Sequence, residues 1–229
     1  MPYVPPATDP ARLNTFSDGV FAIAATLLIL TIDVLHLPAA GPHPRLAQAL
    51  ARQWPEYLAY VVSFLIILIK WMTHHRMMEH VRRVNNWFLL LNGLVLLVVA
   101  FIPFPTALLA AYWNDAREAQ TAASVYCGTY LVFALCFTAL WRYATHHGRL
   151  LGPRPNLVAV ARITRRYAWG LGCYVAVFVG SFYFPIYSCG SILLLALYLA
   201  WPHPTHVPGL FRRKKPVPGP IPALRNGGG

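Results

Sequence analysis

Charged side chains are scarce in this sequence of 229 residues: Asp, Glu, Lys and Arg together make up 11% of it, whereas hydrophobic residues make up 57%. A soluble domain usually carries about a quarter charged residues. The chain lacks the polar surface that a water-exposed globule needs, and its mean hydropathy is +0.49. This composition excludes a soluble enzyme, a disordered chain and a secreted disulfide scaffold, and it indicates an integral membrane protein.

Cysteine is also scarce, and no two of the four cysteines form a C-x-x-C pair. Because all four fall in or beside apolar segments, buried free thiols are favoured over a metal site or disulfides. Adjacent histidines such as His74 and His75 point about 100° apart on a helix, so they do not form a chelating pair. No resident metal and no cofactor are expected. The four cysteines are Cys127, Cys136, Cys173 and Cys189.

Acidic residues number only seven, and none lies in the middle of an apolar segment after the first. Coupled carriers commonly place an ionisable group near the membrane midplane. The pattern therefore counts against a secondary ion or solute transporter, which stays the alternative function. Lys70 is expected to extend its amine to the inner membrane surface. Serines and cysteines inside the membrane have no obvious paired base, so an enzyme is not expected.

Six apolar segments are long or well bounded enough to cross a membrane as helices, at about 20 residues a crossing. Pro103 and Pro105 are expected to bend or end the third helix. Because no strand pattern competes, the predicted fold class is all-α with six transmembrane helices. The segments cover approximately residues 14–36, 55–73, 87–112, 121–144, 166–186 and 188–202.

Basic residues gather on one side of these spans. Of the nineteen Lys and Arg, only Arg45, Arg52 and Arg117 fall on the other side, which predicts that both termini are cytoplasmic. The net charge of +12 then reflects topology and anionic lipid headgroups at the basic inner face, and no nucleic acid is expected as a partner. The predicted division is a cytoplasmic N-terminal arm (1–13), a six-span membrane domain (14–202) and a disordered basic, Pro/Gly-rich cytoplasmic tail (203–229).

The first span is bounded by two carboxylates, Asp18 and Asp33, and is rich in small residues. Ionised carboxylates are costly against hydrocarbon, so this helix is expected to face protein or water. Five residues along it follow at steps of 4, 3, 4 and 3, which places them on one stripe of a helix. We call them the stripe: Gly19, Ile23, Thr26, Leu30 and Asp33.

In a symmetric oligomer with the stripe at its axis, each of these residues would form a ring. Hydrophobic rings can gate by dewetting, hydroxyl oxygens can replace ion hydration, and an outer ring of carboxylates concentrates cations. The same spacing also suits plain helix packing, which is the more frequent use of such a stripe. Spacing alone therefore favours packing over a pore.

The opening of this span carries a recognisable motif, Arg12-x-x-x-Phe16-Ser17-Asp18. It resembles the RxxxFSD signature of the transmembrane protein 175 family of potassium channels, and the six-span layout is similar too. The animal lysosomal channel of that family carries two such repeats, whereas this chain has one, like bacterial members. The resemblance implies a homotetramer in a bacterial plasma membrane, with the first helices around a central pore.

The resemblance also implies roles for the stripe residues, and it favours a pore over plain helix packing. The family's pore positions fall on Ile23, Thr26 and Leu30, with Ile23 and Leu30 as the hydrophobic gate and Thr26 as a polar ring that favours potassium. Asp33 is expected to collect cations at the outer mouth. Since the sequence contains no TVGYG filter, modest discrimination is expected. The predicted function is a potassium-permeable cation channel, with permeant K⁺ near Thr26 and no other metal.

The motif residues themselves are expected to clasp the first helix to its neighbours. Arg12 and Asp18 are six residues apart and do not lie one above the other on a helix. Buried Ser17 and Asp18 would need hydrogen-bond donors. A structural clasp is favoured over ion binding by Asp18 at the inner mouth. The candidate donors are the Arg76–His80 stretch, Asn85, Asn86, Asn92 and Trp169.

Overall fold

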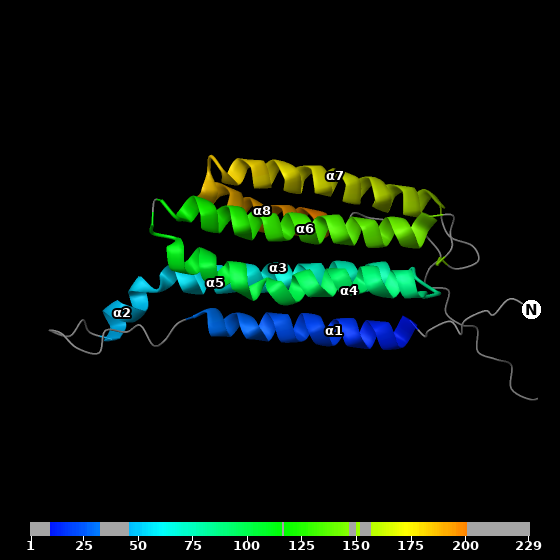
Figure 1. The fold of residues 1–229 in the computed structure, drawn as a ribbon, viewed down its shortest axis with the longest axis horizontal. Helices are drawn as coiled ribbons and strands as arrows, with labels where there is room; N and C mark the ends of the chain where they lie inside the picture. Colours follow the sequence, from blue (N-terminus) through cyan, green and yellow to red (C-terminus); the bar gives the residue numbers. More distant parts are fainter. Residues whose placement is uncertain (1–9, 33–45, 116, 147–149, 152–156, 201–229) are drawn as a thin grey trace, which may run out of the picture.

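The computed structural model describes residues 10–32, 46–115, 117–146, 150–151 and 157–200. Within these ranges the chain is helical, apart from turns and one isolated antiparallel bridge between Val81 and Leu151. The long helices lie side by side along one direction (Figure 1). The all-α prediction is confirmed for the described part of the chain.

Among the residues that the structure describes, four helical segments are long and apolar enough to cross a membrane. They coincide with the first four predicted spans. The first joins α1 to a 3-10 turn, and the third joins two helices end to end. Their bounds are α1 Pro10–Leu27 with η1 Leu28–Thr31, α3 Trp54–Met78, α4 Asn86–Phe101 with α5 Pro103–Tyr112, and α6 Ala119–Thr145.

The last two helices differ from their predicted bounds. α7 (Leu157–Ser181) begins nine residues before the predicted fifth span, and its first half carries Arg162, Arg165 and Arg166. α8 (Pro185–Ala200) has 16 residues, fewer than a usual crossing. The structure thus supports four of the six predicted spans by length and composition. That α7 and α8 also cross the membrane remains a prediction.

Proline explains the break in the third span. α4 ends at Phe101 and α5 begins at Pro103, which has no N–H to donate to the preceding turn. Around the break, the N–H of Ile102 bonds to the carbonyl of Val99 at 3.2 Å, so the helix tightens before it restarts. This confirms the predicted interruption. The region expected as an outer loop contains a short additional helix, α2 (Leu46–Arg52).

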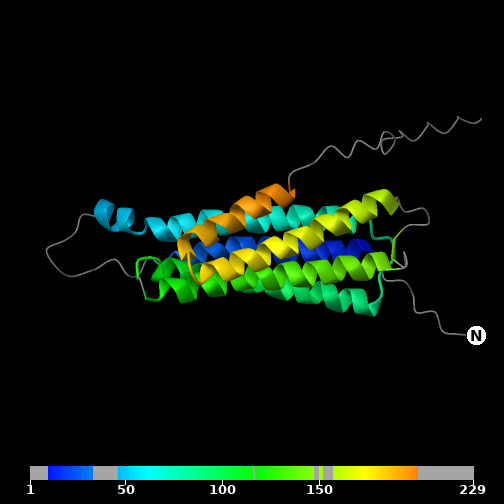
Figure 2. The same ribbon diagram turned by 90° about the horizontal axis from the view of Figure 1, so that it is seen from above.

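The helices are arranged around α6, which packs against α4, α5, α7 and α8. In contrast, α1 lies at one edge of the molecule against α3 and α4, on the side opposite α7 (Figure 1). Seen from above, α1 therefore runs behind α7 (Figure 2). Three of the largest fully buried side chains, Tyr126, Tyr130 and Trp141, come from α6. The core is therefore built on α6, and the described residues cover only one side of α1.

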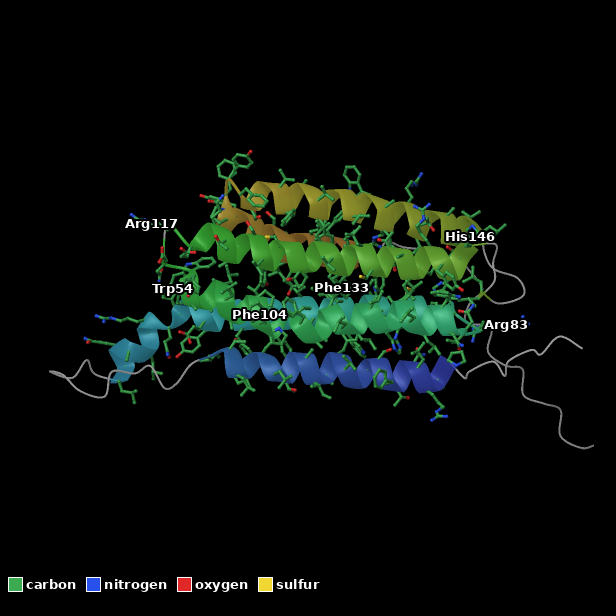
Figure 3. The ribbon with its side chains drawn as sticks, viewed as in Figure 1. Trp54, Arg83, Phe104, Arg117, Phe133 and His146 are labelled. Atoms are coloured by element: carbon green, nitrogen blue, oxygen red, sulfur yellow. The ribbon has the colours of Figure 1, made fainter. Side chains whose placement is uncertain are left out.

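The two ends of the bundle separate Arg117, predicted on the outer side, from Arg83, predicted on the inner side. Trp54 and Arg117 lie at one end, and Arg83 and His146 lie at the other (Figure 3). At the latter end, the carbonyl of Leu150 accepts from the backbone N–H groups of Arg82 and Arg83, at 2.8 and 3.3 Å. These bonds join the connection after α3 to the connection after α6.

Lys70 does not extend to the membrane surface, so that prediction is wrong. Its side chain is 7% exposed, and its Nζ donates to the hydroxyl of Tyr174 at 2.5 Å. The Nζ also lies 4.4 Å from the ring centroid of Tyr174 and 4.9 Å from that of Phe133. These aromatic side chains from α6 and α7 hold the amine inside the bundle, eight residues before α3 ends at Met78.

Candidate functional site

The first helix has one buried face, which packs against α3 and α4. Its members recur at steps of three and four residues, as expected when one side of a helix meets a neighbour. Phe21 is 2% exposed and its ring lies 5.4 Å from the ring of His74 on α3. The buried face consists of Leu13, Ser17, Phe21, Ala24 and Leu28.

The stripe lies on the opposite side of the same helix. Each described stripe residue follows a buried residue by two positions, which is about 200° around an α-helix. Ile23 is 60% exposed and Leu30 is 74% exposed, and Gly19 and Thr26 are exposed as well. No part of the described chain covers this face. Asp33, the predicted outer-mouth carboxylate, lies outside the described residues.

Thr26 presents acceptors rather than a donor on this exposed face. Its Oγ1 donates its proton to the carbonyl of Ile23, one turn back on the same helix, at 2.9 Å. The oxygen lone pairs of the hydroxyl are then left for a partner outside the helix. Because cations bind oxygen acceptors, an exposed threonine with its proton engaged is suited to contact a cation.

The buried face contains a series of hydrogen bonds in which each group donates to the next, from His74 to the carbonyl of Leu13. His74 and Asn92 Oδ1 are joined at 2.8 Å, Asn92 Nδ2 donates to Ser17 Oγ at 3.0 Å, and Ser17 donates to the carbonyl of Leu13 at 2.9 Å. Since Oδ1 only accepts, Nε2 of His74 carries the proton in this arrangement. The chain joins α3, α4 and α1 at one point inside the bundle.

Asp18 is held by a second contact, to a residue that is not among the predicted donors. Trp71 on α3 donates its indole N–H to Asp18 Oδ1 at 2.8 Å. An indole N–H only donates, so it suits a carboxylate that lies partly out of water. The signal available in sequence was a tryptophan just before the His74-His75 pair, at the inner part of the second span.

The predicted clasp residues and donors separate into two groups. Ser17 and Asp18 contact neighbouring helices, whereas Arg12 is exposed without an ion pair in the described chain and Phe16 is 64% exposed. Among the candidate donors, Asn92 reaches the motif. Asn85 instead accepts from the N–H of Phe88 at the start of α4 and bonds to Tyr143, and Trp169 is 65% exposed.

These contacts can hold α1 in a fixed rotation about its own axis. Hydrogen bonds across helices are worth roughly 1 kcal/mol each in membranes, and burial of Phe21 adds packing. Within the described residues, no three His, Cys, Asp or Glu side chains come together in a way that could hold a metal ion. The arrangement thus presents the stripe in a defined direction, with Thr26 as its polar member.

Comparison with known proteins identifies the family. The model of a family described as the endosomal/lysosomal potassium channel TMEM175 matches residues 12–103. A potassium channel of Chamaesiphon minutus is 42% identical over 86% of this chain and 96% of its own length. This chain belongs to the TMEM175 family. A potassium channel of Streptomyces collinus is 47% identical over 82% of this chain and 89% of its own.

The structural comparison agrees with this membership. The crystal structure described as a lysosomal potassium-selective channel TMEM175 homologue from Chamaesiphon minutus superposes with a TM-score of 0.73 and 41% identity, covering 83% of this chain and 96% of that one. The TMEM175 of Bos taurus, named an endosomal/lysosomal proton channel, is 32% identical over 62% of this chain but only 31% of its own.

Family membership settles the broad class of the chain. It confirms the resemblance carried by the Arg12-to-Asp18 motif and places the chain among TMEM175-family channel proteins rather than enzymes. It does not favour the alternative of a secondary transporter. The family match covers α1, α3 and α4 and extends to Pro103, so it includes both faces of the first helix.

Proposed function

We propose that this TMEM175-family chain is one subunit of a homotetrameric, potassium-permeable channel whose pore is lined by the stripe of α1. The observation that carries the proposal is the exposure of the stripe on the side of α1 opposite its packed face. In this arrangement the six helical segments cross a bacterial plasma membrane. Both termini are cytoplasmic, and the basic inner end lies against anionic headgroups.

The chemistry of the stripe supports distinct roles along the pore. Ile23 and Leu30 would form apolar rings, and such constrictions stop ions by excluding water when they are narrow. Between them, Thr26 would present four hydroxyl oxygens whose protons are engaged within their own helices. Asp33 would supply a ring of carboxylates at the outer mouth. A pore of this kind needs no TVGYG loop, which the sequence lacks.

Two further observations support a pore rather than a lipid-facing surface. The clasp through Ser17 and Asp18 fixes the rotation of α1, which a helix in contact only with lipid would not require. The bacterial relatives that align over nearly their whole length are named potassium channels. Both facts favour a role for the exposed face in ion permeation.

Ion flux through substituted stripe residues tests the proposal. The full chain is reconstituted in liposomes, and potassium flux is compared between the unaltered protein and Ile23→Asn. An amide at the narrow ring would remove the dewetting barrier, so we expect a clear increase in resting potassium flux. The matched control is Val179→Asn, an apolar position on α7 with a similar exposure (52%, against 60% for Ile23) and remote from α1.

The outcomes separate the alternatives. Flux that rises with Ile23→Asn but not with Val179→Asn supports a pore along the stripe. Equal flux in all three proteins would remove Ile23 from the pathway. Flux that saturates with potassium and turns over orders of magnitude more slowly than channel conduction would indicate a carrier instead of a pore.

A further inference from the structure

The buried amine of Lys70 lies in a part of the molecule that the proposed channel mechanism does not use. The side chain is 7% exposed, and its one hydrogen-bond partner in the described chain is the hydroxyl of Tyr174. None of the described acidic side chains pairs with it. A buried ammonium without a counter-charge is costly, because it has lost its water without gaining an anion.

Lys70 borders a cavity of about 40 Å³ between α3, α6, α7 and α8. Most of the lining is apolar, including Phe133, Phe137 and Leu199. On one wall, Gly170 allows close approach of Leu199: a Cβ on this glycine would lie 2.8 Å from a methyl carbon of Leu199. The space is sufficient for a particle of about the size of a water molecule or slightly larger.

Three polar groups around this cavity have N–H or O–H bonds that find no acceptor in the described chain. An ammonium has three N–H bonds, and the Tyr174 hydroxyl accepts one of them. The O–H of Tyr174 and the hydroxyl of Thr138 find no acceptor in the described chain, although both residues line the cavity. The hydroxyl of Thr73 is different, because its proton is already donated to the carbonyl of Ile69 at 2.9 Å.

We propose that this cavity binds one small monovalent anion of the size of chloride, held by the Lys70 ammonium and the hydroxyls of Tyr174 and Thr138. A neutral water could accept from at most two of these donors and would leave the charge uncompensated. A cation is excluded by the ammonium. A carboxylate or phosphate headgroup with its lipid chains exceeds the available volume.

The site is separate from the stripe. Lys70 faces α6 and α7, whereas the stripe lies on the uncovered side of α1 at the other edge of the bundle. Thr73 and Tyr167 line the cavity at positions nearer the inner ends of their helices than Lys70 and Tyr174. An anion would thus enter from the inner side. Because the site is remote from the stripe, we expect a bound anion to stabilise the folded bundle rather than to change ion flux along the stripe.

Thermal unfolding of the purified full chain in chloride and in gluconate tests this site. Potassium concentration and ionic strength are kept equal, and chloride replaces gluconate stepwise. Since a ligand that binds only the folded state raises Tm, we expect Tm to rise and then saturate with chloride. Thr138→Val should shift the half-maximal chloride concentration upward by roughly tenfold, because one hydrogen bond to a charged ligand is lost.

Lys70→Met should abolish the chloride dependence, while Arg162→Met, which removes an exposed cation of α7, should leave it unchanged. In case Lys70→Met does not fold, broadening of the ³⁵Cl magnetic resonance line by the unaltered protein provides a second measurement. Line broadening that is weaker in Thr138→Val than in the unaltered protein at the same chloride concentration supports the site. Identical Tm values in chloride and gluconate, or a chloride dependence that persists in Lys70→Met, would overturn it.

Discussion

The two faces of the first span, α1 together with η1, are built from the same 22 residues but have opposite surroundings. On one face, Ser17 and Phe21 are almost inaccessible and contact α3 and α4. On the other, Ile23 and Leu30 are 60% and 74% exposed within the described part of the chain. The contrast teaches that the subunit fixes where α1 points, and that the described residues leave the stripe uncovered. Stability and permeation should therefore respond to different substitutions on one helix.

The largest expected difference is between two residues that are two positions apart, Phe21 and Ile23. Phe21→Ala leaves a cavity beside His74 and should lower the free energy of unfolding by roughly 3 kcal/mol. This is the lower part of the range for buried phenylalanines, because a bilayer supplies less of the water-transfer contribution. Ile23→Ala should change subunit stability by no more than about 0.5 kcal/mol. Denaturant unfolding of detergent-solubilised protein measures both.

Potassium flux should show the opposite order of effects, with the larger change at Ile23 and the smaller one at Phe21. Ile23→Ala should alter flux in liposomes, since it widens the proposed ring, while any Phe21→Ala protein that remains folded should conduct with a similar selectivity. If both substitutions lowered stability equally, the stripe would be in contact with the subunit's own core. That result would contradict the separation of the two faces.

The hydrogen-bond chain on the buried face should give the next largest effect. Asn92→Leu keeps the volume but leaves Ser17 Oγ and the Nε2–H of His74 without their partner. We expect a cost of about 1 kcal/mol for each of these two groups, because interhelical hydrogen bonds contribute little in membranes. Ser17→Ala removes one bond and should cost less. Because the residues form one network, the double substitution should cost less than the sum of the single ones. Additive costs would show that Ser17 and Asn92 act independently.

The long helices, the exposed side of the first helix and the break at Pro103 could be predicted from sequence, because each follows from the local pattern of residues along a helix. The steps between Gly19 and Leu30 place these residues on one side of a helix, and the apolar runs predict the long helices. Pro103 marks the break between α4 and α5 through its missing N–H. Each of these inferences depends on residues close together in the chain, where helix geometry is known in advance.

Partners across helices could not be derived in the same way. Trp71 and Asp18 are 53 residues apart, and only the packing of α1 on α3 brings them together. Lys70 was expected at the membrane surface because its side chain is long enough to reach there from the inner part of α3. The aromatic rings of Phe133 and Tyr174, from two other helices, give the amine a closer partner.

The smallest expected effect on stability, and the one most specific to permeation, comes from Thr26. Thr26→Val keeps the branched shape and loses only a bond within its own helix, so the free energy of unfolding should change by about 0.5 kcal/mol or less. Four oxygen acceptors would leave the proposed ring together. If they jointly favour potassium over sodium by about 1 kcal/mol, the permeability ratio should fall roughly fivefold.

The reversal potential with potassium on one side of the membrane and sodium on the other measures this ratio. Thr26→Ser is the matched control, because its hydroxyl can make the same bond to the carbonyl of Ile23 and still present its lone pairs. Selectivity that falls with valine and is retained with serine assigns the preference to the oxygen rather than to the width of the ring. An unaltered reversal potential in Thr26→Val would leave Ile23 and Leu30 as the remaining narrow positions and would remove Thr26 from ion discrimination.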